Sequence, residues 1–134
     1  ASAVEMCSEA VGILEESACT LSEQAHACNS LSRRHIQNQD PVSALEMASK
    51  ALALHREDHW PRGQGVSLLN MSFAHCMLGD FREAQRTSEE ARAIAQQAGD
   101  VCMQAEALHM LGEVHMKDED FVSATRVMNL AVSL

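Results

Sequence analysis

Apolar residues recur every three to four positions along most of the chain, which is the spacing of one helix face. At the N-terminus this rhythm runs through Val4, Cys7, Val11 and Leu14 and predicts a helix over residues 1–17. No stretch alternates apolar and polar residues with the Val, Ile, Thr and aromatic content typical of a strand. The pattern therefore predicts an all-α protein.

Polar capping residues mark where further helices begin. Thr20 and Glu23 form a capping box, in which the Thr hydroxyl accepts from the Glu23 amide and the Glu side chain reaches back. Asp40 precedes Pro41, and Pro is tolerated at a first helical position because its missing N–H would be unsatisfied there. The same kind of cap is predicted at Asp80, Asp100 and Asp120. The helices that start at these caps are expected to end near residues 34–37, 55, 98 and 116–117, and the last one begins at 120.

One helix lacks such a cap. The segment 56–65, REDHWPRGQG, is expected to be the least regular, because Pro61 fixes φ while Gly63 and Gly65 loosen the start of the next helix. That helix is expected to run to residue 78, where Gly79 ends it in a left-handed conformation. The chain then has about seven helices, and turns of a few residues make neighbouring helices antiparallel.

These helices repeat with a period of 40 residues. Residues 78–91 and 117–131 carry Asp, Phe, Ala and Ala at the same offsets, and a third copy lies upstream: Asp80, Phe81, Ala84, Ala91; Asp120, Phe121, Ala124, Ala131; Asp40, Pro41, Ala44, Ala51. Residues 2–11 align with 43–52, so the first helix is interpreted as the second half of an incomplete repeat. One hairpin cannot bury its apolar face alone, so stacked hairpins build the core.

The third repeat resembles a known family. Leu111-Gly112, His115, Phe121 and Ala124, followed by Met128 and Ala131, resemble the tetratricopeptide repeat (TPR) pattern L-G-x-x-Y…A-x-x-x-F. The longer period and the string at residues 91–100 resemble the variety found in kinesin light chain and in Leu-Gly-Asn spindle adaptors. The resemblance implies one TPR-like domain over 1–134, a right-handed solenoid of antiparallel hairpins. It divides into an incomplete repeat at 1–18 and repeats at 19–58, 59–98 and 99–134.

The chain also departs from the family pattern. Leu31-Ser32 and Met71-Ser72 replace Leu-Gly in the first two repeats, and His replaces Tyr at 35, 75 and 115. Three recurring imidazoles could suggest a metal, but equivalent residues of stacked helices lie about 10 Å apart. Two Zn–N bonds of about 2 Å cannot bridge that gap. Each ring is expected at the interface of its two helices, donating to a carbonyl.

Composition restricts the function further. A net charge of −9 argues against nucleic-acid binding, which needs clustered Lys and Arg. The five Cys lack the paired spacing of a disulfide framework or a zinc site, so free thiols in a reducing compartment are expected; they are Cys7, Cys19, Cys28, Cys76 and Cys102. No window of 18 apolar residues could span a membrane, so no direct membrane insertion is expected.

No catalytic chemistry is predicted either. The sequence has no Gly-rich phosphate loop, G-x-S-x-G or H-E-x-x-H motif, so no enzyme activity, cofactor or metal is expected. The chain starts and stops inside helix patterns, which is interpreted as a fragment, a processed form or part of a longer array. The expected compartment is the cytoplasm or another reducing one, or an organelle interior if a targeting segment has been removed.

Two aromatic residues are predicted to belong to the core. Phe81 and Phe121 begin the second helix of their hairpins, and each is expected to pack into the core of the adjacent hairpin. Truncation of either to Ala is then expected to cost about 3–5 kcal/mol.

The family resemblance implies a partner-binding groove along the first helix of each hairpin. Its predicted residues are His26, Asn29, Arg33, Ile36, Val66, Leu69, Phe73, Cys76, Met77, Glu106, His109, Glu113, Met116 and Lys117. The middle of this set is apolar and its two ends carry opposite charges, which suits a helical or extended peptide segment. The grip on a C-terminal carboxylate in chaperone-binding TPR proteins is not reproduced, because Glu106 and Met110 stand in the third repeat.

The predicted function is therefore a non-enzymatic protein–protein interaction scaffold or adaptor. The alternative is a structural or accessory subunit of a large multi-subunit assembly, organellar assemblies included, in which a neighbouring subunit is the partner. A sensor regulated through the Cys residues is a third hypothesis. The oligomeric state and the identity of the partner are not predicted.

Overall fold

The computed structural model describes residues 2–16 and 20–134, and side chains from 2–13 and 20–134. The side chain of Leu14 and all of Cys19 therefore lie outside the described residues. All regular secondary structure in the described part is helical, as predicted. The helices are α1 (Ala3–Glu16), α2 (Leu21–Gln37), α3 (Pro41–Glu57), α4 (Pro61–Met77), α5 (Phe81–Ala98), α6 (Val101–Lys117) and α7 (Phe121–Val132).

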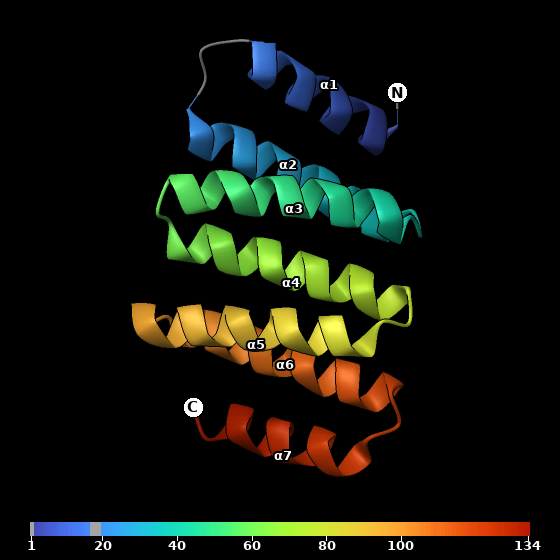
Figure 1. Ribbon diagram of the computed structural model, residues 1–134, viewed down its shortest axis with the longest axis vertical. Coiled ribbons are helices and arrows are strands. Elements are labelled where there is room, and N and C mark those ends of the chain that lie inside the picture. Colours follow the sequence, from blue (N-terminus) through green and yellow to red (C-terminus); the bar gives the residue numbers. More distant parts are fainter. Residues whose placement is uncertain (1, 17–19) are drawn as a thin grey trace.

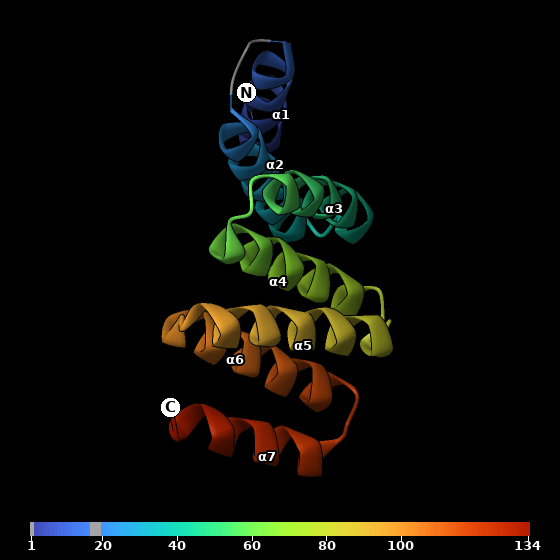
Figure 2. The same ribbon diagram turned by 60° about the vertical axis from the view of Figure 1, so that its left-hand side comes forward.

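The helices stack in chain order as antiparallel neighbours along one axis (Figure 1). Each helix contacts the next, and α4 also contacts α2 and α6. Among the described residues no corresponding contact joins α3 to α5 or α5 to α7. The A helices (α2, α4 and α6) are therefore closer together than the B helices (α1, α3, α5 and α7), so the A helices form the inner side of the stack. Figure 2 shows that the helix orientation changes along the stack from α1 to α7. This is a solenoid of helical hairpins.

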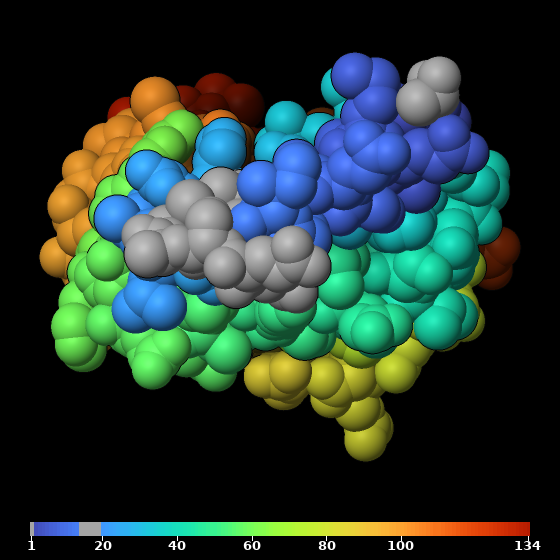
Figure 3. Space-filling view, turned by 90° about the horizontal axis from the view of Figure 1, so that it is seen from above, coloured from blue at the N-terminus to red at the C-terminus, as the bar shows by residue number. Residues whose placement is uncertain are grey.

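The two ends of the stack differ in what covers them. At the N-terminal end α1 packs against α2, and Figure 3 shows it lying across this end of the molecule. At the other end α7 packs against α6, with Phe121, Val122 and Val132 exposed. The last helix therefore carries apolar side chains that the described chain does not cover.

The predicted caps begin their helices. Thr20 Oγ1 accepts from the Glu23 amide at 3.2 Å, and Asp100 Oδ1 accepts from the Met103 amide at 3.0 Å. The backbone hydrogen bond to Met103 is the largest cause of the lowered pKa of Asp100, followed by the hydrogen bond from Arg62. Asp40, Asp80 and Asp120 cap in the same way.

The turns share a left-handed residue every 20 positions. The φ angle is 60° at Gln39, 53° at His59, 79° at Gly79, 69° at Gly99 and 61° at Glu119. Glycine adopts this conformation without the Cβ clash that other residues suffer. The prediction for Gly79 is confirmed, and Gly99 occupies an equivalent position, but Gln39, His59 and Glu119 carry no glycine signal that would have revealed the shared turn.

The segment 56–65 is more regular than predicted. Helix α3 continues to Glu57 and α4 begins at Pro61, so the connection is as short as the others. Gly63 lies inside α4, where an added Cβ would stand 2.5 Å from Nδ1 of His55. The glycine is needed for close approach of α3 and α4 rather than for flexibility, which is why the sequence interpretation was wrong here.

Small residues let the two helices of each hairpin approach closely. Ala44, Ala84 and Ala124 are buried, and they face the position that is Ser32, Ser72 and Gly112 in successive repeats. The Ser32 hydroxyl donates to the Ala44 carbonyl and the Ser72 hydroxyl to the Ala84 carbonyl, both at 2.7 Å. The departures from Leu-Gly thus place a hydroxyl that bonds the partner helix.

The core prediction for the two phenylalanines is only half right. Phe81 is half-buried and packs against the cluster that contains Cys76, Met110 and Val114. Phe121 is 57% exposed. The two differ because Met110 and Val114 belong to α6, the A helix that follows α5, whereas α7 is the last helix among the described residues. The predicted cost of truncating Phe121 is therefore too large.

Candidate functional site

The inner side of the stack contains a cavity of about 500 Å³ that crosses all three A helices. It is lined by Arg33, Ile36 and Gln37 of α2; Leu69, Asn70 and Phe73 of α4; and Glu106, His109, Met110 and Glu113 of α6. Ile36 and Leu69 are half-buried, while Phe73 is 44% exposed. The floor is thus apolar and partly accessible to solvent.

The two rims of this groove carry opposite charge. Arg33 is exposed on α2, and Glu106 is exposed on the opposite rim, on α6. Glu113 lies 4.0 Å from Nε2 of His109, also on α6. A ligand that lies across the A helices therefore meets a cation at one rim and carboxylates at the other.

One polar atom in the groove wall has no partner. Nδ2 of Asn70 is buried and makes no hydrogen bond in the described structure. A buried amide without a partner is costly, so a ligand oxygen that accepted from it would recover this hydrogen bond.

A smaller cavity of about 70 Å³ extends the groove toward the C-terminal ends of α4 and α6. Its walls include Phe73, Cys76, Met77, Glu113 and Lys117. Burial raises the pKa of the Cys76 thiol, with a smaller opposing effect from Lys117. The thiol therefore stays protonated at neutral pH and acts as a small apolar side chain.

The structure brings most of the residues predicted for the groove together. The two cavities contain Arg33, Ile36, Leu69, Phe73, Cys76, Met77, Glu106, His109, Glu113 and Lys117. The other four lie elsewhere. His26 lines a separate hollow beside Trp60, Asn29 is buried and accepts from the Ser67 hydroxyl at 3.0 Å, Val66 is half-buried, and Met116 is 45% exposed outside both cavities.

Sequence reasoning missed three residues that line the larger cavity. They are Gln37, Asn70 and Met110. Gln37 precedes Met77 and Lys117 by 40 and 80 positions, so the repeat register of two predicted residues could have identified it. Asn70 and Met110 are also 40 apart, and each follows a groove residue directly.

Two of the recurring histidines, His35 and His115, lie at the interfaces within their hairpins, as expected, but with different partners from those predicted. Nδ1 of His35 is 3.8 Å from Oδ2 of Asp40, and Nδ1 of His115 is 3.9 Å from Oδ2 of Asp120. Each of these rings therefore faces the carboxylate that caps the next helix, rather than a carbonyl as predicted. The backbone carbonyl oxygens of His35 and His115 accept from the backbone amides of Asp40 and Asp120, respectively.

Neither metal-binding groups nor disulfides stand out in the part of the chain that the structure describes. Within it, no three His, Cys, Asp or Glu side chains are placed to hold a metal ion. Cys7, Cys28, Cys76 and Cys102 form no disulfide among the described residues. None of the described helices combines the length and apolar character that crossing a membrane requires.

Comparison with known proteins rests on structure alone. No protein-family model matches the sequence, and no curated protein matches it significantly. The TPR domain of Arabidopsis FLU is similar with a TM-score of 0.78 and 16% identity, over 84% of this chain and 95% of that one. Aspartyl phosphate phosphatase F from Bacillus subtilis is similar with a TM-score of 0.85 and 13% identity, over 97% of this chain and 34% of that one.

A further similar structure contains nearly identical TPR-like repeats of a candidate kinesin light chain from Podospora anserina. It has a TM-score of 0.76 and 16% identity, over 97% of this chain and 64% of that one. The chain therefore spans less than two thirds of both the phosphatase and the Podospora protein, and nearly all of the FLU domain. At these identities the likeness concerns the fold. The order of the hairpins, the inner A helices and these neighbours show that this chain has the tetratricopeptide-repeat fold.

Proposed function

We propose that this chain is a non-enzymatic protein-interaction scaffold that holds a helical or extended segment of a partner protein in the groove along α2, α4 and α6. The observation that carries the proposal is the accessible apolar floor of that groove. Phe73 is 44% exposed, and with Ile36 and Leu69 it lines a cavity of about 500 Å³. A half-exposed aromatic side chain inside a concave surface is typical of a site that buries a partner's apolar residue.

The charges of the two rims define the orientation of the segment. A basic residue of the partner would face Glu106 and Glu113 on α6, while an acidic residue would face Arg33 on α2. Such charges select a partner and its direction more than they add affinity, because they lie at the solvent-exposed rim. The apolar contact with Phe73 would supply most of the binding energy.

The groove is less suited to catalysis. An active site needs a nucleophile, a base and an orienting group in one cleft. The smaller cavity that extends the groove contains Cys76, whose buried thiol stays protonated. His109 and Glu113 are solvent-accessible and 4.0 Å apart. One of the similar structures is named as a phosphatase, but this chain matches 34% of its length.

The experiment places a charge in the groove. Phe73→Glu combined with Met77→Glu is expected to abolish capture of the partner in a pull-down of the full-length protein. Val42→Glu is the matched control, because Val42 is 64% exposed on α3, a B helix outside the groove. Capture that survives the double substitution would overturn the proposal, provided circular dichroism shows that the variant remains folded.

A second function is favoured by the exposed face of α7. Phe121 is 57% exposed, Val122 72% and Val132 88%. These exposed apolar side chains suit a structural subunit that docks against a neighbour in a larger assembly, since exposed apolar patches mark interaction surfaces. Val122→Glu would then disrupt assembly while Phe73→Glu would not.

A further inference from the structure

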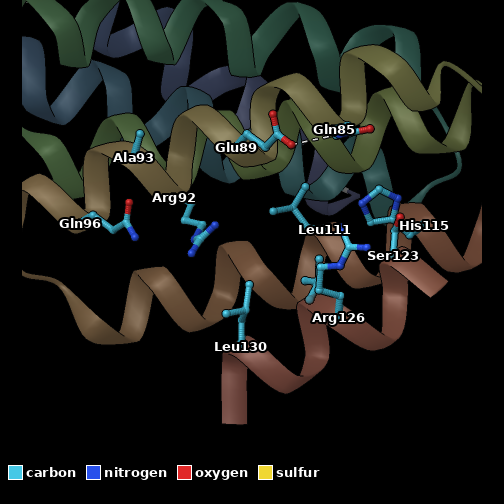
Figure 4. Close-up of a pocket in the computed structure, with 11 residues that line it drawn as sticks. Gln85, Glu89, Arg92, Ala93, Gln96, Leu111, His115, Ser123, Arg126 and Leu130 are labelled. Carbon is cyan, nitrogen blue, oxygen red and sulfur yellow. Dashed lines mark hydrogen bonds between the residues drawn. The ribbon is translucent and has the colours of Figure 1, made fainter. Parts of the chain in front are cut away.

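A second groove lies on the other side of the stack, between the B helices α5 and α7. Its cavity is about 470 Å³, and α6 closes it from behind through Leu111 and His115 (Figure 4). The other lining residues come from α5 and α7: Gln85, Glu89, Arg92, Ala93, Gln96, Ser123, Arg126, Val127 and Leu130. None of them belongs to the groove along the A helices.

The equivalent place one repeat earlier, between α3 and α5, is bridged by one ion pair. Nη2 of Arg56 on α3 donates to Oε1 of Glu90 on α5 at 2.8 Å. Arg86 then contacts Glu90 at 3.4 Å and Glu83 at 3.0 Å. Helices α3 and α5 are thus linked, and both Arg56 and Arg86 are paired with carboxylates.

At the positions 40 residues later, the acidic residues of these ion pairs are replaced. Arg56 becomes Gln96, Glu90 becomes Leu130 and Glu83 becomes Ser123, while Arg86 is retained as Arg126. Leu52, which is buried on α3, corresponds to Arg92 on α5. The groove between α5 and α7 therefore gains Arg92, keeps Arg126 and lacks carboxylates at the positions equivalent to Glu83 and Glu90, while its one acidic lining residue is Glu89.

The two arginines extend into the same space. Figure 4 shows Arg92 reaching from α5 and Arg126 reaching from α7, with Leu111 between them. In the described structure no ion pair or hydrogen bond joins either guanidinium to a carboxylate. Glu89, the acidic residue that lines this groove, accepts from Gln85 at 3.0 Å. Asp120 is affected by the charge of Arg126, but its lowered pKa is due first to the hydrogen bonds with Ser123.

Apolar side chains lie beside these cations. Leu130 is 41% exposed, Val127 is half-buried, and Leu111 is buried behind them. The groove thus offers two guanidinium groups next to an apolar surface, in a protein whose net charge is −9. Guanidinium groups match carboxylates well because they can donate two parallel hydrogen bonds.

We propose that the groove between α5 and α7 is a second docking site, which binds an acidic segment of a partner protein through carboxylates paired with Arg92 and Arg126 and an apolar side chain packed on Leu130 and Val127. This site is separate from the groove that carries the proposed scaffold function, and its partner has the opposite chemistry from one chosen by Glu106 and Glu113. One chain could therefore hold two different segments at once.

The test uses a defined probe, a helical peptide built from Glu, Leu and Ala, against the full chain labelled with ¹⁵N. In an NMR titration the peptide is expected to shift the amides around Arg92, Arg126 and Leu130, and a matched peptide with Lys in place of Glu is expected to leave them unchanged. Arg126→Gln is expected to weaken binding by about tenfold or more, the effect of losing one charged hydrogen-bonding pair. Phe73→Glu is expected to have no effect.

A closing variant provides the sharpest control. Gln96→Arg combined with Leu130→Glu recreates between α5 and α7 the ion pair that Arg56 and Glu90 form between α3 and α5. This variant is expected to abolish the amide shifts caused by the acidic peptide, while the amide signals of α2–α4 stay unchanged. The proposal is overturned if the acidic peptide causes no saturable shift, or if its shifts lie along the A helices. It is also overturned if Arg126→Gln and the closing variant both bind like the unmodified protein, or if inorganic phosphate shifts the same amides and the peptide does not.

Discussion

Replacement of His55 by Leu is expected to remove a pH dependence from the stability of this protein. His55 is fully buried on α3, with its ring edge-on to Trp60 at a centroid distance of 5.2 Å. Neither Nδ1 nor Nε2 has a hydrogen-bond partner in the described structure. Burial lowers the pKa of the imidazole below its usual 6.5; a nearby Asp58 opposes this shift and His26 adds to it.

The sign of the effect follows from proton binding. Above pH 6.5 the ring is neutral in both the folded and the unfolded chain, so it contributes no pH dependence. Below pH 6.5 the His55 imidazole binds a proton in the unfolded chain, but in the folded chain it does so only near its lower pKa. The free energy of unfolding therefore falls as the pH falls. One proton gives a slope of at most about 1.4 kcal/mol per pH unit. Between pH 7.5 and 5.5 the expected loss is therefore up to about 1.4 kcal/mol.

Urea titrations at these two pH values measure the difference directly. The unmodified protein is expected to lose stability on acidification, and His55→Leu is expected to lose less by about 1 kcal/mol. At pH 7.5 the variant is expected to be at least as stable, because an apolar side chain leaves no unpaired nitrogen behind. His109→Leu is the control, since the His109 side chain is 74% exposed. Equal losses in His55→Leu and the unmodified protein would refute the reasoning.

Three further predictions concern packing and turns. Phe81→Ala is expected to cost about 2–4 kcal/mol and Phe121→Ala less than about 1 kcal/mol in denaturant titrations; equal costs would contradict the burial of the first and the exposure of the second. Glu119→Gly is expected to raise the free energy of unfolding by about 0.5–1 kcal/mol, because it relieves the left-handed strain at φ 61°; a lower melting temperature would disprove this. Gly112→Ser is expected to raise the free energy of unfolding by about 1–2 kcal/mol, because the new hydroxyl could donate to the Ala124 carbonyl. The new Cβ would lie 3.4 Å from Met128, so a lower free energy of unfolding would show that Met128 cannot adjust.

Much of the groove follows from the repeat register. Arg33, Phe73 and Glu113 lie on A helices at positions that the helical period places on one face, so sequence reasoning could group them. Asn29 shares that face by period, yet it is buried because its amide oxygen accepts from Ser67 of α4. Gln37 was missed because no apolar or charge pattern distinguishes an exposed Gln at a helix end.

The second groove shows what the repeat register can and cannot reveal. The offsets alone show that Glu90 is replaced by Leu130 and Arg56 by Gln96. They do not show that Arg56 and Glu90 contact each other, because these residues lie on different helices and 34 positions apart. That contact depends on how α3 and α5 lie relative to each other.

The sequence by itself determined the helical class, the caps and the repeating hairpin, because these depend on interactions within a turn or two of helix. It also placed the left-handed turn at Gly79, where the residue type is a direct signal. Only the tertiary structure decided that His55 is buried without a partner, that Phe121 is exposed while Phe81 is covered, and that one groove between B helices is bridged while the next is open. Each of these depends on which helix packs across from the residue, and that neighbour is set by the stacking of the hairpins rather than by local sequence.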